Sequence, residues 1–432
     1  MGRPLKATLD APLTLPCGVT LKNRLAKGAM TEGLASTQGV STPELERLYG
    51  LWSAGGAAML LTGNVQIDRN HLERPGNVII DREPDEAALE ALRRFAAAGT
   101  ANDTQLWMQI SHAGRQTQAK LNPRPKAPSA IKVALPGGQF GEPVALTEAE
   151  ILDLIGRFAT AARVAKETGF TGVQIHAAHG YLLSSFLSPR SNIRTDDWGG
   201  SLENRARMLM EAVKATRAAV GPGFPISVKL NSADFQKGGF DFDDSLMVAR
   251  WLQAAGVDII EISGGSYEQP AMMDMDGMEA REMPQVAAST AAREAYFVDF
   301  AKAMKAELHV PLMVTGGFRT RAAMEQALAS GSADLIGLGR PLCADPFGPS
   351  RMLAGERALK RHEDELALFP PWLGWLRGMK LGKAIDSFAV QYWYYAQLYA
   401  LGRNGRADQN LTVWQGWRAV EKRHAELLKE RV

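Results

Sequence analysis

The chain has 432 residues and only two cysteines, Cys17 and Cys343, which are far apart in the sequence. A disulfide framework needs several cysteines, and a zinc or iron–sulfur site built from cysteine needs them closely spaced. We therefore expect neither kind of site in this protein, and we expect the two thiols to play no part in a metal centre.

The sequence also lacks an excess of charge of one sign and a long apolar run. Lys and Arg together number 49 and Asp and Glu 47, so the net charge is only +2. This balance gives no support to nucleic-acid binding or to attraction by an anionic membrane. No stretch approaches the roughly 18 to 20 apolar residues that span a bilayer, and the N-terminus lacks the pattern of a signal peptide. We predict a cytoplasmic protein with no nucleic-acid partner and no membrane contact.

Short apolar runs alternate with amphipathic stretches along the first four fifths of the chain. The runs with strand character are 21–30, 57–65, 104–110, 172–177, 225–230, 257–263, 311–316 and 333–339. Parallel neighbouring strands need helical crossovers, and continuous apolar strands fit a sheet that is covered on its outer face. Eight such units predict a closed (β/α)8 barrel, the TIM barrel, rather than an open sheet.

Helices are expected between these strands. Their ranges are 43–54, 84–98, 147–168, 201–220, 242–255, 291–307 and 320–330, and Thr147 with Glu150 forms a capping-box signature at the start of one of them. The loops 111–146 and 264–288 follow the third and sixth strands and are long enough to be lids or pocket walls.

The alternation stops near residue 350. We expect residues 1–348 to form the barrel and residues 349–432 a helical extension, in which 369–417 is rich in Trp and Tyr. Aromatic density of this kind is typical of an interface, so we expect the extension to pack on the barrel or on a neighbouring subunit of a homo-oligomer. An amphipathic helix lying on a membrane surface is the alternative that we favour less.

Polar residues at the carboxyl ends of the strands are the candidates for function, because barrel active sites are built there. Thr31 follows the first strand, Gln109 ends the third, and Lys229 lies within the fifth. A buried ammonium is costly unless an anion or a strong acceptor pairs with it. The seventh and eighth strands end in Gly316-Gly317 and Gly339-Arg340, the place where barrels bind phosphate through backbone N–H groups and a cation.

The fourth strand ends in "HAAHGY", which brings His176, His179 and Tyr181 together. The spacing of the histidines differs from that of a helical zinc motif, and no third ligand is evident, so we expect no metal here. Two imidazoles beside a phenol also have too much polar demand for a dry core. The remaining interpretation is a pair of hydrogen-bond donors directed at one oxygen, with a phenol as proton source.

The chain resembles the Old Yellow Enzyme family of FMN-dependent NADH:flavin oxidoreductases, or ene-reductases. The stretch "HAAHGYLLSSFLSPRSNIRTDDWGGSLENR" carries most of the resemblance, and "NRLAKGAMT", "WMQISHAGRQ", "TGGF" and "DLIGLGRPLCADP" follow the family order from about residue 10 to 348. The resemblance implies non-covalent FMN, NADH or NADPH as the hydride donor, and reduction of a small activated alkene.

The resemblance also implies a role for each candidate residue. His176 and His179 would bind the carbonyl or nitro oxygen of the substrate, and Tyr181 would donate a proton to its α-carbon. The residues implied in FMN binding are Gly28, Ala29, Met30, Thr31, Gly63 and Gln109 around the ring, Lys229 at its N1–O2 edge, and Gly316, Gly317, Gly339 and Arg340 at the phosphate.

Several alternatives stay open at this point. Some members of the family act on an amine or an acyl thioester, and a barrel lyase with Lys229 as a Schiff-base lysine would also bind phosphate. Gly33 stands where some relatives have a tyrosine that contacts substrate, so that wall of the pocket is undefined. The substrate, the choice between NADH and NADPH, and the role of 369–417 are not determined by the sequence.

Overall fold

The computed structural model describes residues 7–135, 138–265, 268 and 297–430. Eight parallel strands close into a barrel, because each pairs with the next one along the chain and the last, β13, pairs with the first, β3. They are β3 Leu25–Lys27, β4 Met59–Leu61, β6 Gln105–Ser111, β9 Gly172–Ala177, β10 Ile226–Asn231, β11 Ile259–Ser263, β12 Leu312–Thr315 and β13 Leu335–Leu338. The predicted (β/α)8 barrel is confirmed, and each predicted run overlaps one of these strands.

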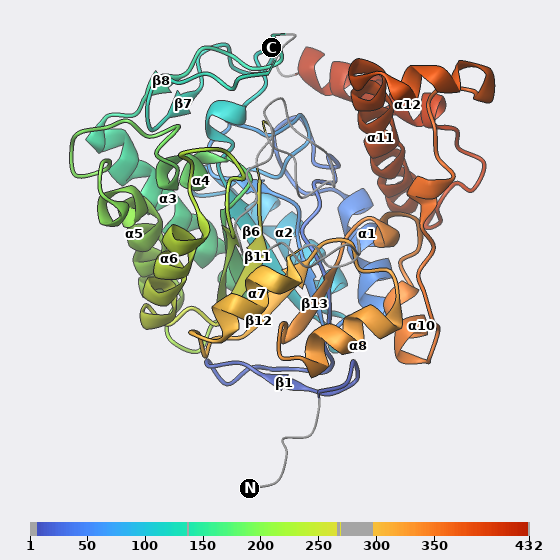
Figure 1. Cartoon of the computed structure of the whole chain (residues 1–432), viewed down its shortest axis with the longest axis horizontal. Helices are drawn as coiled ribbons and strands as arrows, with labels where there is room; N and C mark the ends of the chain where they lie inside the picture. Colours follow the sequence, from blue (N-terminus) through green and yellow to red (C-terminus); the bar gives the residue numbers. More distant parts are fainter. Residues whose placement is uncertain (1–6, 136–137, 266–267, 269–296, 431–432) are drawn as a thin grey trace, which may run out of the picture.

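Helices follow the strands and cover the outer face of the barrel (Figure 1). They are α1 Pro43–Ala54, α2 Glu86–Thr100, α3 Glu148–Glu167, α5 Leu202–Val220, α6 Phe242–Ala254, α7 Val298–Lys305 and α8 Arg321–Ala329. The capping box of Thr147 and Glu150 is formed at the start of α3. The first residues of the helix predicted over 291–307 lie outside the described part of the chain.

The barrel interior changes from apolar to polar along the strands. Successive side chains alternate between the two faces of a strand, so every second residue points inward. At the amino ends, the inward side chains form an apolar cluster that contains Ala26, Met59, Leu61, Trp107, Ile259, Met313 and Leu335. The hairpin of β1 Leu13–Thr14 and β2 Thr20–Leu21 packs against this cluster and closes the bottom of the barrel (Figure 1). Buried polar groups of the interior gather towards the carboxyl ends, where His176, Lys229 and Glu261 lie side by side on neighbouring strands.

The first long loop contains regular structure. Residues 111–146 include the short helix η1 Gly114–Gln116 and the parallel pair β7 Lys126–Ala127 and β8 Val144–Ala145. Two more short elements, β5 Val65–Gln66 and α4 Leu182–Leu187, lie near the same end of the barrel. The second long loop, 264–288, lies almost entirely outside the described residues.

The extension is helical, as predicted. The short helix α9 Pro341–Ala344 follows β13, and the extension then consists of α10 Gly348–Leu353, which begins at its boundary, η4 His362–Asp364, η5 Pro371–Gly378, α11 Lys380–Asn404 and α12 Val413–Lys429. Figure 1 shows α11 and α12 on one side of the barrel mouth, with β7 and β8 on the other.

The extension packs on the barrel of its own chain. Arg47 of α1 donates to the carbonyl oxygen of Gly402 at 2.6 Å, and Arg423 of α12 donates to that of Gly33 at 2.8 Å. Arg403 forms an ion pair with Glu44 at 3.0 Å. Among the described residues, no helix combines the length and the apolar character that crossing a membrane requires.

Candidate functional site

A cavity of about 230 Å³ opens at the carboxyl ends of the strands, and we call it the inner cavity. Twelve of the fourteen predicted site residues line it: Ala29, Met30, Thr31, Gln109, His176, His179, Tyr181, Lys229, Gly316, Gly317, Gly339 and Arg340. They come from six barrel strands or the turns that follow them. The barrel therefore brings together residues that are up to about 300 positions apart in the chain.

The two remaining predicted residues, Gly28 and Gly63, lie behind the lining. The N–H of Gly28 donates to the Leu338 carbonyl at 2.8 Å, and that of Gly63 donates to Glu32 at 2.8 Å. A Cβ at Gly63 would lie 2.6 Å from the Met30 carbonyl oxygen, closer than real side chains approach. Gly63 thus lets the turn after β3 pack closely, and its contact with a cofactor stays a prediction.

Strand register places a polar network under the inner cavity. Lys229 on β10 is opposite Glu261 on β11, and their side chains form an ion pair at 3.0 Å. Gln174 on β9 donates to the other oxygen of Glu261 at 2.8 Å and accepts from Gln109 on β6 at 2.7 Å. The sequence predicted that Lys229 needs an anion or a strong acceptor, but it did not identify Glu261. The acidic residue inside the apolar strand "VDIIEIS" could have indicated this partner.

Two buried polar atoms of the inner cavity fit a flavin. Gln109 Oε1 and Thr315 Oγ1 are buried, and neither has a hydrogen-bond partner within the described part of the chain. A buried polar atom without a partner is costly, and the ring N–H, C=O and N atoms of a flavin are suitable partners. The lining thus fits FMN, and Gln109 and Thr315 have the free hydrogen-bonding atoms that its ring would need.

Part of the lining of the inner cavity is cationic. Arg340 lies there together with Arg319, which the sequence reading did not select although it follows Gly316-Gly317 by two positions. Arg319 is 3% exposed and forms an ion pair with Glu363 at 2.6 Å. Two guanidinium groups beside turns with bare backbone N–H groups are suited to a phosphate.

His176 is buried and lies at the end of β9. Its Nδ1 accepts the backbone N–H of Ala178 at 3.2 Å, so the neutral ring carries its proton on Nε2. Burial lowers the pKa of His176 well below its usual value, and the nearby Lys229 lowers it further. The imidazole is therefore neutral at physiological pH and can donate one hydrogen bond from Nε2.

His179 has a positive φ of 65°, which is rare for a residue with a side chain. Three contacts hold this conformation. Its N–H donates to Asn231 Oδ1 at 3.0 Å, its carbonyl accepts from Gln116 Nε2 at 2.8 Å, and its Nε2 lies 2.6 Å from Ser263 Oγ. The sequence did not predict these three partners, which come from β10, η1 and β11. Burial, followed by Lys229, lowers the pKa of His179 well below its usual value.

Tyr181 precedes α4 and is 6% exposed. The centroid of its ring is 5.0 Å from that of His176 and 6.5 Å from that of His179, and the two imidazole centroids are 5.0 Å apart. The three rings meet edge to face. A phenol and two imidazoles are therefore within reach of one small group in the inner cavity.

The extension supplies part of the same lining. Gln391, Tyr394, Tyr395 and Leu398 of α11 all border the inner cavity. The hydroxyl of Tyr394 donates to Glu363 at 2.8 Å, the carboxylate that also pairs with Arg319. The aromatic density of 369–417 was visible in the sequence, but its position over the barrel mouth was not.

One other group of side chains, Asp68, His71 and His112, has the composition of a metal site. Asp68 Oδ2 lies 3.0 Å from His71 Nδ1 and 3.7 Å from His112 Nε2. The other nitrogens, His71 Nε2 and His112 Nδ1, accept backbone N–H groups at 2.8 and 3.0 Å. A neutral imidazole that accepts on one nitrogen carries its proton on the other, which then cannot bind a metal. The arrangement favours a hydrogen-bonded carboxylate over a metal centre.

Comparison with known proteins places the chain among flavin enzymes. Residues 8–358 match the NADH:flavin oxidoreductase / NADH oxidase family. An NADH-dependent flavin oxidoreductase of Neonectria sp. (strain DH2) is 40% identical over 78% of this chain, although the chain spans only 46% of that protein. Similar enzymes of Hypocrea jecorina (strain QM6a) and Talaromyces variabilis are 36% and 35% identical, and the matches span 88% and 99% of those proteins. The match to the Talaromyces protein covers 92% of this chain, so it includes part of the extension.

Solved structures agree with this assignment. A 2-naphthoyl-CoA reductase in complex with 2-naphthoyl-CoA superposes with a TM-score of 0.72 at 27% identity, covering 81% of this chain and 52% of the other. Morphinone reductase in complex with tetrahydroNAD gives 0.65 at 25% identity, covering 82% and 92%. The described barrel, the fit of its inner cavity to FMN and these matches together show that the chain belongs to the NADH:flavin oxidoreductase / NADH oxidase family, as an FMN-dependent oxidoreductase of the Old Yellow Enzyme type that uses NADH or NADPH.

Proposed function

We propose that the protein reduces the activated C=C bond of α,β-unsaturated carbonyl or nitro compounds. One observation carries the proposal: two neutral imidazoles and a phenol meet within a few ångströms of one another in the inner cavity, whose lining also includes the phosphate-type turns. The inner-cavity residues would hold FMN, which would supply the redox chemistry: acceptance of hydride from NAD(P)H and its donation to the β-carbon of the alkene.

His176 and His179 bind the oxygen of the substrate. Negative charge grows on this oxygen as hydride reaches the β-carbon, so donors that are already oriented stabilise the transition state more than the ground state. His176 is suited to this role because its backbone contact leaves the proton on Nε2. Ser263 and Asn231 are positioning residues that act through His179.

Tyr181 gives its proton to the α-carbon, which completes the addition of H– and H+ across the double bond. A phenol is a weak acid, with an ordinary pKa near 10, but the enolate-like carbon that it meets is more basic. Its ring packs beside His176, so the proton donor lies close to the place where the oxygen is held.

The alternatives are less well supported. Schiff-base chemistry requires a lysine amine that is free to attack a carbonyl, whereas Lys229 Nζ is 3.0 Å from the Glu261 carboxylate. Family membership also favours redox chemistry over a lyase. Oxidation of an amine requires no donor pair for a carbonyl oxygen and no phenolic proton source. Reduction of an unsaturated acyl thioester would use the same chemistry and differs from the proposal only in the group that is joined to the carbonyl carbon through sulfur.

Anaerobic stopped-flow spectroscopy tests the proposal, because the two half-reactions are measured separately. NADH or NADPH should bleach the flavin, and 2-cyclohexenone should reoxidise it. Tyr181→Phe should slow reoxidation by about 10²- to 10⁴-fold, the range for a general acid, and leave the reductive half-reaction nearly unchanged. Equal loss in both half-reactions would refute the role of Tyr181. A cytoplasmic location also remains part of the proposal, and fractionation of the source cells tests it.

A further inference from the structure

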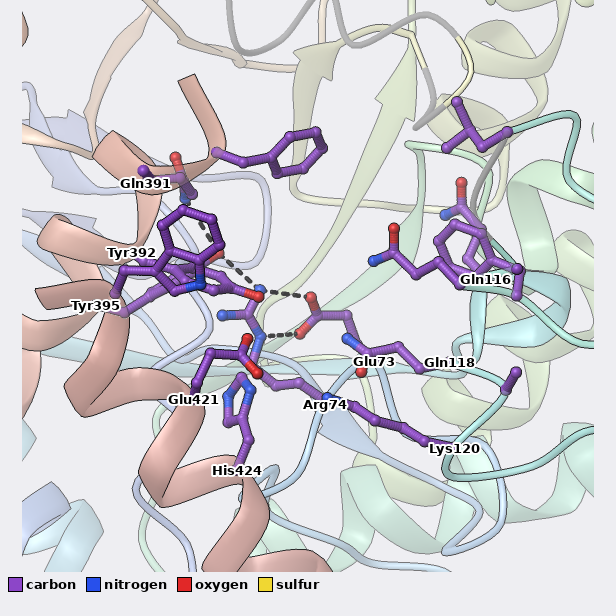
Figure 2. Close-up of a pocket in the computed structure, with 18 residues that line it drawn as sticks. Glu73, Arg74, Gln116, Gln118, Lys120, Gln391, Tyr392, Tyr395, Glu421 and His424 are labelled. Carbon is purple, nitrogen blue, oxygen red and sulfur yellow. Dashed lines mark hydrogen bonds and ion pairs between the residues drawn. The ribbon is translucent and has the colours of Figure 1, made fainter. Parts of the chain in front are cut away.

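A second, larger cavity of about 580 Å³ adjoins the inner cavity, and we call it the outer pocket (Figure 2). One wall consists of α11 and α12, and the other consists of residues from 116–140 of the long loop after β6. Glu73, Gln391 and Tyr395 line both cavities. Gln116 also lines the outer pocket, and its amide donates to the carbonyl of His179. The outer pocket therefore begins beside the residues that are proposed to hold the reacting oxygen.

The lining of the outer pocket is aromatic. Its five aromatic side chains are Phe140, Phe388, Tyr392, Tyr395 and Trp417, and four of them belong to the extension. Flat rings pack well on such side chains and bury a large apolar area. The outer pocket is thus suited to an aromatic or polycyclic group of a ligand.

The charges of the outer pocket are balanced. Arg74 donates to both oxygens of Glu73, at 2.8 and 2.7 Å, and its guanidinium also stacks on the Tyr395 ring. The other two charged residues of the lining, Lys120 and Glu421, are of opposite sign. A dinucleotide or a coenzyme A thioester carries several phosphates and requires an excess of positive charge. The described lining offers no such excess, so it disfavours both.

His424 is a buried polar group without a partner in the described structure. It is 2% exposed, it lines the outer pocket, and neither ring nitrogen has a hydrogen-bond partner among the described residues. Figure 2 shows its ring directed from α12 towards Arg74 and the space between the two walls. Burial, followed by the charge of Arg74, lowers the pKa of His424 to about 3. A neutral imidazole offers one donor and one acceptor, which suits a hydroxyl or a carbonyl group of a ligand.

We propose that the outer pocket holds the distal part of an extended, uncharged aromatic enone, with a hydroxyl or carbonyl of this part bonded to His424. The activated double bond of the same molecule then reaches His176, His179 and Tyr181 in the inner cavity. This inference rests on the proposed ene reduction and adds a substrate class to it. The extension is in this view a specificity element, because it builds most of the aromatic lining.

Two enones of different length test the inference on the holoenzyme: 2-cyclohexenone, which is small and has no distal part, and 4-hydroxychalcone, which is long, aromatic and hydroxylated. His424→Leu should lower the ratio of kcat/KM for 4-hydroxychalcone to that for 2-cyclohexenone by about tenfold, the equivalent of one lost hydrogen bond. Trp417→Ala, a second variant in case the first does not fold, should lower the same ratio. Trp372→Ala is the matched control, because this tryptophan is 76% exposed and lines neither cavity.

The outcomes separate the two proposals. If the wild-type enzyme reduces 2-cyclohexenone but neither variant changes the ratio, the outer pocket does not bind the substrate. If the variants instead slow flavin reduction by NADH or NADPH, the nicotinamide nucleotide occupies the outer pocket and the inference is overturned. If the wild-type enzyme reduces neither enone although NAD(P)H bleaches its flavin, the proposed function itself fails.

Discussion

The pH dependence of stability should depend strongly on His424. The side chain is almost completely buried, and its pKa falls to about 3, from 6.5, mainly because of burial. The charges of Arg74, Lys120 and Arg423 act in the same direction. Since the folded form binds its proton less readily than the unfolded chain, acid favours unfolding. This part of the stability is complete above pH 6.5 and is lost progressively as the pH falls towards 3.

The size of the effect follows from the two pKa values. Between pH 7 and pH 5 the unfolded chain gains a proton at this site and the folded protein does not, which costs about 2 kcal/mol of stability. Other buried histidines contribute as well, including His112, whose pKa burial lowers to about 4. A comparison with His424→Leu cancels their contribution, because that variant keeps them.

Urea unfolding at saturating FMN, measured at pH 7 and pH 5, tests the reasoning. His424→Leu should lose about 2 kcal/mol less than the wild type between these pH values. It should also be more stable at pH 7 by about 1 to 3 kcal/mol, since an imidazole without partners is replaced by an apolar side chain. His309 is exposed, and His309→Leu is the control for removal of one histidine, which should keep the wild-type loss. An equal loss in wild type and His424→Leu would refute the assignment of a buried, neutral and unpartnered His424.

Two further variants test the inner cavity. Lys229→Met leaves the buried Glu261 carboxylate without its cation, so we expect a loss of about 3 to 5 kcal/mol in stability and weaker FMN binding, measured by thermal unfolding and flavin fluorescence. Lys229→Arg keeps the charge and is the control, and an unaltered Lys229→Met would contradict the ion pair. Ser263→Ala removes the hydroxyl beside His179 Nε2, so the affinity of the enzyme for a phenol should fall about two- to tenfold. Phenol binding is measured by its charge-transfer band with FMN. The rate of flavin reduction by NADH should stay similar. Unchanged phenol affinity would show that Ser263 does not orient His179.

The barrel, and the strand ends at which most residues of the candidate site lie, could be predicted from the sequence. Strands such as 172–177 and 226–231 could be recognised because their apolar runs are local. The helices α1 and α3 could be recognised because their periodicity is local, as is the capping box of α3. In a closed barrel of eight parallel strands, the carboxyl ends of all strands lie at the same end of the barrel, so residues there come close together. His176 and Arg340 could therefore be assigned to one site without any knowledge of how the strands pair.

Other features depend on contacts between distant segments, which no local pattern reports. The pairing of Lys229 with Glu261 follows from the register between β10 and β11, and a shift of one residue would direct one of the two side chains out of the barrel. The positive φ of His179 persists because Asn231 and Ser263 reach it from other strands.

In the extension, too, some features are local to the sequence and others depend on tertiary contacts. Its sequence determined that it is helical and rich in aromatic residues, because helix periodicity and composition are properties of the segment itself. Only the tertiary structure decided that α11 and α12 lie over the barrel mouth, since their position depends on contacts such as Arg47 with Gly402 and Arg423 with Gly33, each between residues more than 350 positions apart. The amino-acid sequence thus specified which chemical groups stand at the end of each strand, and the packing of the closed chain decided which of them face one another.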